Sequence, residues 1–205
     1  MKSRAVILLC CLLVAAAHAG DPMDVVKTNV DKILQILNDP AYVDQPQLQR
    51  EKLTSVIKQK FDFEQMTALA LGRYRRQLAE EDLKDVTELF TRLLKMTYLD
   101  RIQSYRKNAV TYGGERMIGE RKAEVSTTIG IENDSIPLEY KLYQTGQGEW
   151  LVYDVKIENV SLVSNYRKQF REILFDGSVD DLISKLKEKI REREKQQEGG
   201  SEKTD

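Results

Sequence analysis

The sequence predicts an α+β fold: N-terminal helices, a curved four-stranded antiparallel meander sheet, and two C-terminal helices. Changes in the spacing of apolar residues predict it. Apolar residues recur every three or four positions up to Tyr105, alternate with polar residues up to Ile157, and return to helical spacing after Ser161. Short turns rich in Gly, Asn and Asp separate the alternating segments, which is typical of strands that pair with their neighbours in the chain.

The first helix is predicted to start at Asp21-Pro22, where Asp21 can cap and Pro22 fits the first turn. Asn38-Asp39-Pro40 ends it. Its apolar residues are Val26, Val30, Ile33, Leu34 and Leu37. A second helical segment begins near Pro46 and leads through Phe61-Asp62-Phe63 to Gly72.

The clearest helix covers residues 80–105, because one apolar stripe continues along its whole length. The stripe consists of Leu83, Val86, Phe90, Leu93, Leu94, Thr97, Tyr98, Ile102 and Tyr105. Strands are expected at residues 110–118, 123–131, 136–142 and 150–157. In the last of these, Asp154 alternates with apolar neighbours, which predicts that it faces solvent.

Two helices are predicted to follow Ser161, separated by Asp176-Gly177-Ser178. Ser178 and Asp181 resemble a capping box at the start of the second helix. Residues 196–205 contain no apolar side chain and are expected to form a polar disordered tail. We therefore expect a single domain over residues 20–195.

Residues 1–19 have the pattern of a secretory signal peptide. A short basic start is followed by an apolar run from Ala5 to Ala16, and Ala17-His18-Ala19 matches the small-x-small pattern before a cleavage site. The run is shorter than the ~20 residues needed to span a bilayer. Cleavage after Ala19 would remove both cysteines and the only histidine.

The chain beyond residue 19 therefore offers no thiolate nucleophile, imidazole base, disulfide, or His or Cys metal ligand. An enzyme would have to use carboxylates, hydroxyls or amines, and no phosphate loop or nucleophile elbow is present. Losing Lys2 and Arg4 reduces the 32 basic residues to 30, against 33 acidic residues, so the net charge is −3. This balance argues against nucleic acid as a partner.

The segment from residue 150 to 170, WLVYDVKIENVSLVSNYRKQF, resembles the periplasmic phospholipid-shuttle family, the MlaC-like or toluene-tolerance proteins. Phe61-Asp62-Phe63, the long helix ending near Tyr105, and Asp180-x-Leu182-Ile183-x-x-Leu186 also match, in order along the chain. One departure is Asn159, where glycine is expected.

The resemblance implies a periplasmic carrier that holds phospholipid acyl chains in an apolar cavity between sheet and helices, which the two C-terminal helices help to enclose. It also implies transfer between an inner-membrane ABC transporter complex containing an MCE-domain protein and an outer-membrane lipoprotein complex, in support of outer-membrane lipid asymmetry and solvent tolerance. Exposing acyl chains to water costs about 0.8 kcal/mol per methylene, so two chains cross the periplasm only when a protein cavity shields them from water. Such carriage requires no cofactor and no metal.

We expect the cavity to be lined from both halves of the chain. The predicted lipid-binding residues are Phe90, Leu94, Tyr98, Tyr105, Val125, Ile129, Tyr140, Leu142, Tyr166 and Phe170, with Arg167 at the surface or the cavity mouth. The basic run Arg73, Arg75 and Arg76 is the candidate docking patch for a partner. A lipid-modifying or hydrolytic envelope enzyme is the alternative function, and a structural envelope adaptor is a third.

Overall fold

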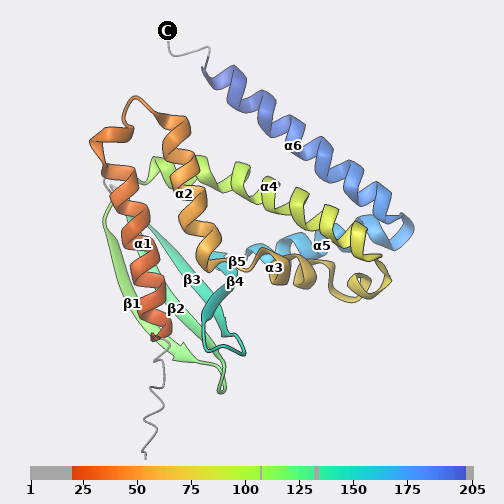
Figure 1. The fold of residues 1–205 in the computed structure, drawn as a ribbon, viewed down its shortest axis with the longest axis horizontal. Coiled ribbons are helices and arrows are strands. Elements are labelled where there is room, and N and C mark those ends of the chain that lie inside the picture. Colours follow the sequence, from red (N-terminus) through yellow and green to blue (C-terminus); the bar gives the residue numbers. More distant parts are fainter. Residues whose placement is uncertain (1–19, 107, 132–133, 202–205) are drawn as a thin grey trace, which may run out of the picture.

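The computed structural model describes residues 20–106, 108–131 and 134–201, and the predicted signal peptide lies outside them. Helices α1 (Pro22–Asn38) and α2 (Pro46–Lys60) lie over one face of a twisted sheet (Figure 1). Helices α3 (Phe63–Leu71), α4 (Glu80–Ser104), α5 (Leu162–Asp176) and α6 (Val179–Ser201) form a second group that extends to one side. Short 3-10 turns cover Pro40–Tyr42 and Gly72–Gln77.

The sheet has the strand order β1-β2-β3-β4-β5, with antiparallel pairing throughout. The four predicted strands are β1 (Val110–Met117), β2 (Lys122–Ile131), β3 (Asp134–Gln144) and β4 (Trp150–Ile157). The two-residue strand β5 (Val160–Ser161) was not predicted. It forms because Glu158 and Asn159 take φ values of 50° and 66°, a left-handed turn that folds the chain back on β4. Asparagine tolerates this conformation, so glycine is not required there.

The C-terminal helix is longer than the sequence predicted. Ser178 and Asp181 form the expected capping box, in which the Ser178 amide donates to Asp181 at 2.7 Å and the Asp181 amide donates to Ser178 Oγ at 3.2 Å. The helix then continues to Ser201, through the first part of the stretch expected to be a disordered tail.

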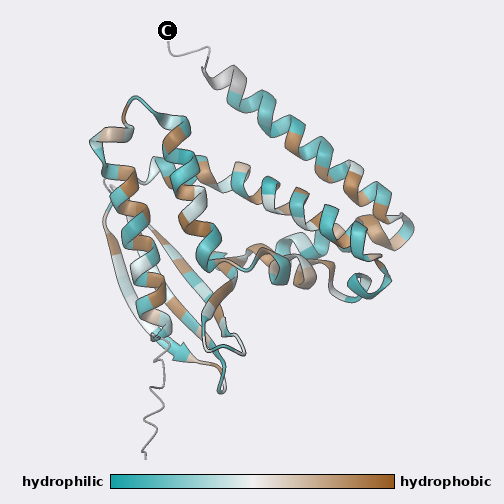
Figure 2. Cartoon of the chain, viewed as in Figure 1, coloured by the Kyte–Doolittle hydropathy of each residue, from teal (hydrophilic) through white to brown (hydrophobic). Residues whose placement is uncertain are grey.

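A closed core lies where α3, α4, α5 and α6 meet. Phe90 on α4 is at its centre, and the ring centroids of Tyr166 and Phe170 lie 4.8 and 5.2 Å away in edge-on contacts. Figure 2 shows the apolar residues of α6 on the side that faces this group, with polar residues along the rest of the helix. Each edge-on aromatic pair contributes about 0.5–1.5 kcal/mol beyond its buried area.

Helix α4 links this core to the sheet side of the molecule. Its 25 residues extend over about 37 Å. The first half packs into the closed core through Val86 and Phe90, whereas Leu99 near its other end belongs to a separate cluster with α1 and α2. The apolar stripe of α4 therefore packs into the closed core along its first half and against α1 and α2 near its end.

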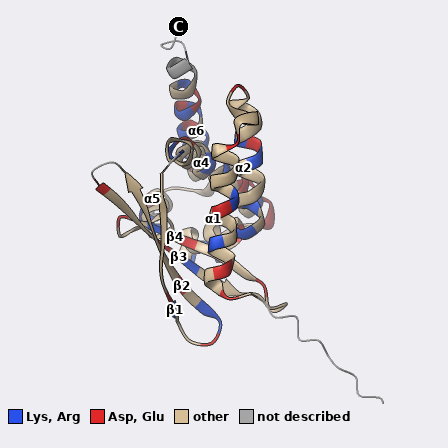
Figure 3. Cartoon of the chain, turned by 90° about the vertical axis from the view of Figure 1, so that its left-hand side faces the viewer, with Lys and Arg blue, Asp and Glu red and all other residues tan. Residues whose placement is uncertain are grey.

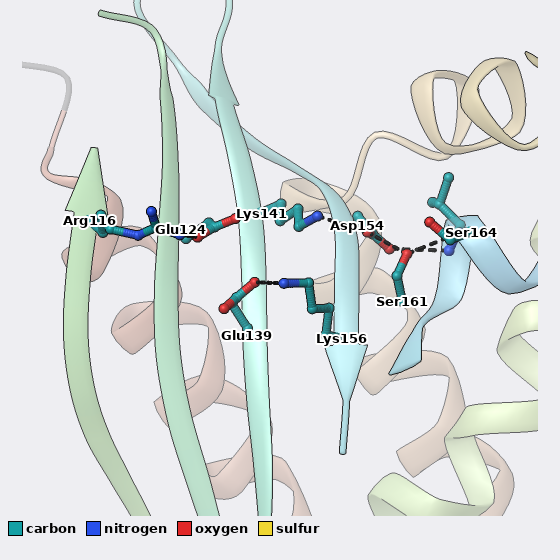
Figure 4. A network of polar contacts seen from close by, with 9 residues as sticks. Arg116, Glu124, Glu139, Lys141, Asp154, Lys156, Ser161 and Ser164 are labelled. Atoms are coloured by element: carbon teal, nitrogen blue, oxygen red, sulfur yellow. Dashed lines mark hydrogen bonds and ion pairs between the residues drawn. The ribbon is translucent and has the colours of Figure 1, made fainter. Parts of the chain in front are cut away.

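The sheet face opposite α1 carries a series of polar cross-strand contacts (Figure 4). Alternate side chains along β2, β3 and β4 point to this face, so charged residues of neighbouring strands meet there. The ion pairs are Arg116 with Glu124, Lys141 with Asp154 at 3.7 Å, and Lys156 with Glu139 at 2.6 Å.

Asp154 is buried, with 4% of its surface exposed, so the expectation that it faces solvent was wrong. Its side chain is on the same outer sheet face as that of Lys141, but the chain that returns through β5 into α5 covers it there. It accepts hydrogen bonds from Ser161 Oγ at 2.7 Å and from the Val163 amide at 3.1 Å. Ser161 Oγ in turn caps α5 by accepting from the Ser164 amide at 3.0 Å. One carboxylate therefore fixes the helix start against β4.

We predict that Asp154→Ala lowers the free energy of unfolding by about 2–4 kcal/mol, because it leaves a buried amide and hydroxyl without their acceptor. Urea unfolding followed by circular dichroism measures the change. The control is Glu188→Ala, which removes an exposed ion pair with Lys185 on α6 and should change stability far less. Equal losses in the two variants would contradict a special role for the buried carboxylate.

Candidate functional site

An apolar cavity with a volume of about 190 Å³ lies between the sheet, α1, α2 and α4. All three buried apolar clusters contribute residues to its wall. Its lining is Val25, Val26, Asn29, Val30, Ile33, Leu34, Leu37, Ile57, Lys60, Phe61, Phe63, Met66, Leu94, Lys95, Tyr98, Leu99, Arg101, Ile102, Tyr105, Val110, Ile129, Leu138, Tyr140, Val152, Val155, Ile157 and Leu162. Such a wall can hold hydrocarbon but offers little for proton transfer.

Helix α1 forms one side of the cavity and is held to strand β1 by polar contacts. The Tyr112 hydroxyl donates to Asp31 at 2.5 Å, and the Lys27 ammonium lies 5.8 Å from the Tyr112 ring centroid. The Met23 amide, in the first turn of α1, donates to Glu115 at 2.7 Å. Asp21 occupies the N-cap position but its side chain makes no capping bond, so the predicted cap was wrong and Glu115 supplies an acceptor from the sheet.

The Phe61-Asp62-Phe63 motif forms the end of the cavity where α2 meets α3. The two phenylalanine rings lie 6.1 Å apart, and both line the cavity. Asp62 caps α3 by accepting from the Gln65 amide at 2.8 Å, and its own amide donates to the Val152 carbonyl at 2.9 Å. The Tyr143 hydroxyl donates to the same carboxylate. Asp62 thus positions both rings against the sheet.

Five of the eleven residues predicted to bind lipid line this cavity: Leu94, Tyr98, Tyr105, Ile129 and Tyr140. They come from the second half of α4 and from the inward face of β2 and β3, as the helical stripe and the strand alternation indicated. Lipid contact by these side chains stays a prediction.

The other six residues are not in the cavity wall. Phe90, Tyr166 and Phe170 are in the closed core, because the first half of α4 packs on α5 and not on the sheet. Val125 and Leu142 do face inward, but α1 and the neighbouring strands cover them completely.

Arg167 is exposed, and its Nε donates to the Leu69 carbonyl at 2.6 Å, so it ties α5 to the end of α3. The two C-terminal helices also contribute less than expected. Leu162, at the start of α5, is the single residue of those helices in the described lining, and α6 packs on α4 in the closed core.

The contribution of α1, α2 and the two phenylalanines to the cavity wall was not predicted from the sequence. The apolar stripe of α1 was visible, but its partner in the sheet is more than eighty residues away, as the 81-residue separation of Asp31 and Tyr112 shows. Nothing in the stripe itself distinguishes a helix that covers a cavity from one that completes a closed core.

Two tyrosines in the wall have raised pKa values. Burial, with a smaller contribution from Tyr166, raises the pKa of Tyr98 to about 12. Burial also raises the pKa of Tyr140. Both phenols are therefore neutral at physiological pH, and they contribute polarity without charge.

The basic run lies in the 3-10 turn after α3, away from the cavity lining. Arg73, Arg75 and Arg76 are exposed, whereas Tyr74 between them is buried in the closed core. The Arg73 guanidinium lies 5.0 Å from the Tyr74 ring centroid and donates to its hydroxyl at 3.0 Å. Arg75 and Arg76 have no ion pair among the described residues.

Two properties of the described residues bear on function. None of the helices there is long and apolar enough to cross a bilayer. The same part of the chain has no group of three or more His, Cys, Asp or Glu residues arranged to hold a metal ion.

The sequence matches the MlaC protein family over residues 27–188. The chain belongs to the MlaC family. Among its relatives, the toluene tolerance protein Ttg2D of Pseudomonas putida is 22% identical over 178 residues, which cover 85% of this chain and 82% of the relative. The intermembrane phospholipid transport system binding protein MlaC of Haemophilus influenzae is 25% identical over 122 residues, covering 58% and 57% of the two chains.

The fold also matches the phospholipid-binding protein from Ralstonia solanacearum, solved in complex with a phospholipid. The TM-score is 0.78 at 27% identity, and the match covers 85% of this chain and 99% of that one. The resemblance noted in the sequence is therefore confirmed for the family and for the α+β fold.

We predict that alkaline destabilisation of the protein depends on Tyr98. The folded-state pKa of about 12 lies above the ordinary value of 10, so folding favours the neutral phenol. Its contribution to stability is complete below pH 10 and is lost as the pH rises from 10 to 12. Urea unfolding of wild type and Tyr98→Phe across this range should show a shallower pH dependence for the variant. The same pH dependence of the unfolding free energy in both proteins would contradict this prediction.

Proposed function

We propose that this MlaC-family protein is a carrier that holds phospholipid acyl chains in the apolar cavity between α1, α2, α4 and the sheet. The observation that carries the proposal is the cavity itself, almost wholly apolar and still open to solvent, in a chain similar to a protein solved with a phospholipid. Burial of each acyl methylene contributes about 0.8 kcal/mol, so the hydrocarbon chains alone supply a large favourable binding free energy.

We further propose that the protein is exported, with cleavage after Ala19, and acts in the periplasm. There it would receive lipid from one membrane complex and deliver it to another: an inner-membrane ABC transporter with an MCE-domain protein, and an outer-membrane lipoprotein complex. The secretory pattern of residues 1–19 and the name of the Haemophilus relative, an intermembrane phospholipid transport system binding protein, support this assignment.

Carriage also suits the chemistry of the cavity wall better than catalysis does. Its polar members are Asn29, three tyrosines and basic side chains, with no carboxylate among the described lining. Hydrolysis of an ester would require a nucleophile with a base beside it. A lipid-modifying or hydrolytic enzyme therefore remains the alternative, and a structural adaptor is the third.

Organic extraction of the purified protein followed by mass spectrometry distinguishes the three functions. Intact diacyl phospholipid at a fixed ratio to protein supports the carrier. Lysolipid or free fatty acid that accumulates with time would contradict it and support an enzyme. If the protein contains no lipid or lipid product, even after incubation with vesicles, the structural adaptor is the remaining function.

We predict that Val30→Trp reduces the lipid that co-purifies with the protein by at least half. Val30 lies on α1 and lines the cavity, and an indole there occupies the space proposed for acyl chains. The matched control is Val43→Trp, at an exposed position between α1 and α2 outside the cavity wall, which should keep the wild-type lipid ratio. Full lipid content in a folded Val30→Trp variant would exclude this cavity as the lipid site.

We also predict that Arg75→Gln/Arg76→Gln slows lipid transfer to the membrane complex, whereas the amount of bound lipid stays unchanged. Both guanidinium groups are exposed, distant from the cavity lining and free to pair with an acidic partner surface. Transfer from loaded protein to vesicles is measured with and without the MCE-containing complex. The control is Lys187→Gln/Arg191→Gln on the exposed side of α6. Equal rates for both double variants would remove the docking role of this patch.

A further inference from the structure

A second hollow lies directly beside the apolar cavity, between α2, α4 and α6. Its volume is about 540 Å³, and its wall is polar and basic, with Arg50, Lys58, Arg92 and Lys95 and a single described carboxylate, Glu51. Figure 3 shows basic residues on both α2 and α6 near α4, with acidic residues among them. We call this feature the basic groove.

The basic groove and the apolar cavity share part of one wall. Lys95 and Leu99, one turn apart on α4, line both of them. A lysine has an apolar stem and a charged end, so Lys95 can contact hydrocarbon on one side and an anion on the other. The shared wall is short, because the two residues lie about 6 Å apart along the helix axis.

The charges in the groove are unevenly compensated. Arg50 pairs with Asp100, and Arg92 pairs with Glu194 at 2.5 Å. In contrast, Lys58 and Lys95 make no ion pair or hydrogen bond with any described residue. Burial lowers the pKa of Lys95, and Lys58 and Arg92 lower it further by repulsion. Two ammonium groups that repel each other, neither of them paired with Glu51 or with another described carboxylate, form a site that an anion would stabilise.

We propose that the basic groove binds the phosphate of a lipid whose acyl chains occupy the cavity, with Lys58 and Lys95 as its charged ligands. This inference rests on the proposed carrier function. The lysines act as point charges toward the phosphodiester oxygens, and the hydroxyls of Thr54 and Ser55 in the same wall supply further donors. The arrangement favours lipids that carry a phosphate over lipids with the same chains and no charge.

The test compares dissociation of two lipids with identical chains, dioleoylphosphatidylglycerol and dioleoylglycerol. The full-length purified protein is loaded with each and mixed with excess acceptor vesicles. Lys58→Gln/Lys95→Gln should release the phosphatidylglycerol about tenfold faster than wild type. Release of dioleoylglycerol should change far less, because it has no phosphate. The control, Lys84→Gln, lies on an exposed position of α4 outside the groove and should behave as wild type.

Three results would overturn the proposal or its basis. Unchanged phosphatidylglycerol release in a folded double variant excludes the groove as the headgroup site. Faster release of both lipids to the same degree would show that the lysines act on packing and not on phosphate. If wild type takes up neither lipid, the carrier function itself fails.

A third arm separates the lipid phosphate from free phosphate. Inorganic phosphate is titrated into phosphatidylglycerol-loaded and lipid-free protein, and the Thr54 and Ser55 amide signals are followed by NMR. Perturbation in the lipid-free protein alone supports the headgroup site. Saturable binding to both forms would show that the groove is occupied by free phosphate while lipid is held, and would overturn the proposal.

Discussion

An apolar cavity that opens to solvent costs stability, and the rest of the structure depends on how that cost is offset. A dry cavity of about 190 Å³ destabilises a protein by about 5 kcal/mol. Whole domains are stable by only about 5–15 kcal/mol. The cavity therefore consumes a large part of that margin. The closed core of α3, α4, α5 and α6 supplies the packing that the cavity side of the molecule lacks, and α4 connects the two.

Polar anchors at the margins of the cavity complement this arrangement. Asp62 fixes the start of α3 to β3 and β4, Asp154 fixes the start of α5 to β4, and Asp31 and Glu115 join α1 to β1. Each lies outside the apolar wall, so the walls are positioned without filling the space between them. Because these carboxylates lie outside the wall, the described cavity lining contains no acidic side chain.

Most elements of this fold could be predicted from local patterns. The helix over 80–105 and all four long strands agree with the structure within a few residues, because their apolar periodicity is strong and their turns are well marked. The burial of Asp154 could not be predicted, since its side chain is on the outer sheet face as the alternation indicated, but β5 and the start of α5 cover it there. The different surroundings of the two halves of the α4 stripe could not be predicted either, because they depend on which elements of the fold pack against each half. Phe90 and Tyr98 have the same spacing signal, yet Phe90 is enclosed in the core whereas Tyr98 packs on that core and also lines the cavity.

The placement of α1 has a consequence for the order in which the molecule assembles. The helix is complete by Asn38, yet the strand that it covers, β2, ends at Ile131. Contacts between segments so distant in the chain form late, because loop closure must precede them. The closed core draws on residues up to Ile190, and it includes α3 and α4 but not α1. The apolar face of α1 therefore has no complete partner surface until the chain has emerged through β4, and the closed core, which needs residues up to Ile190, is completed later still.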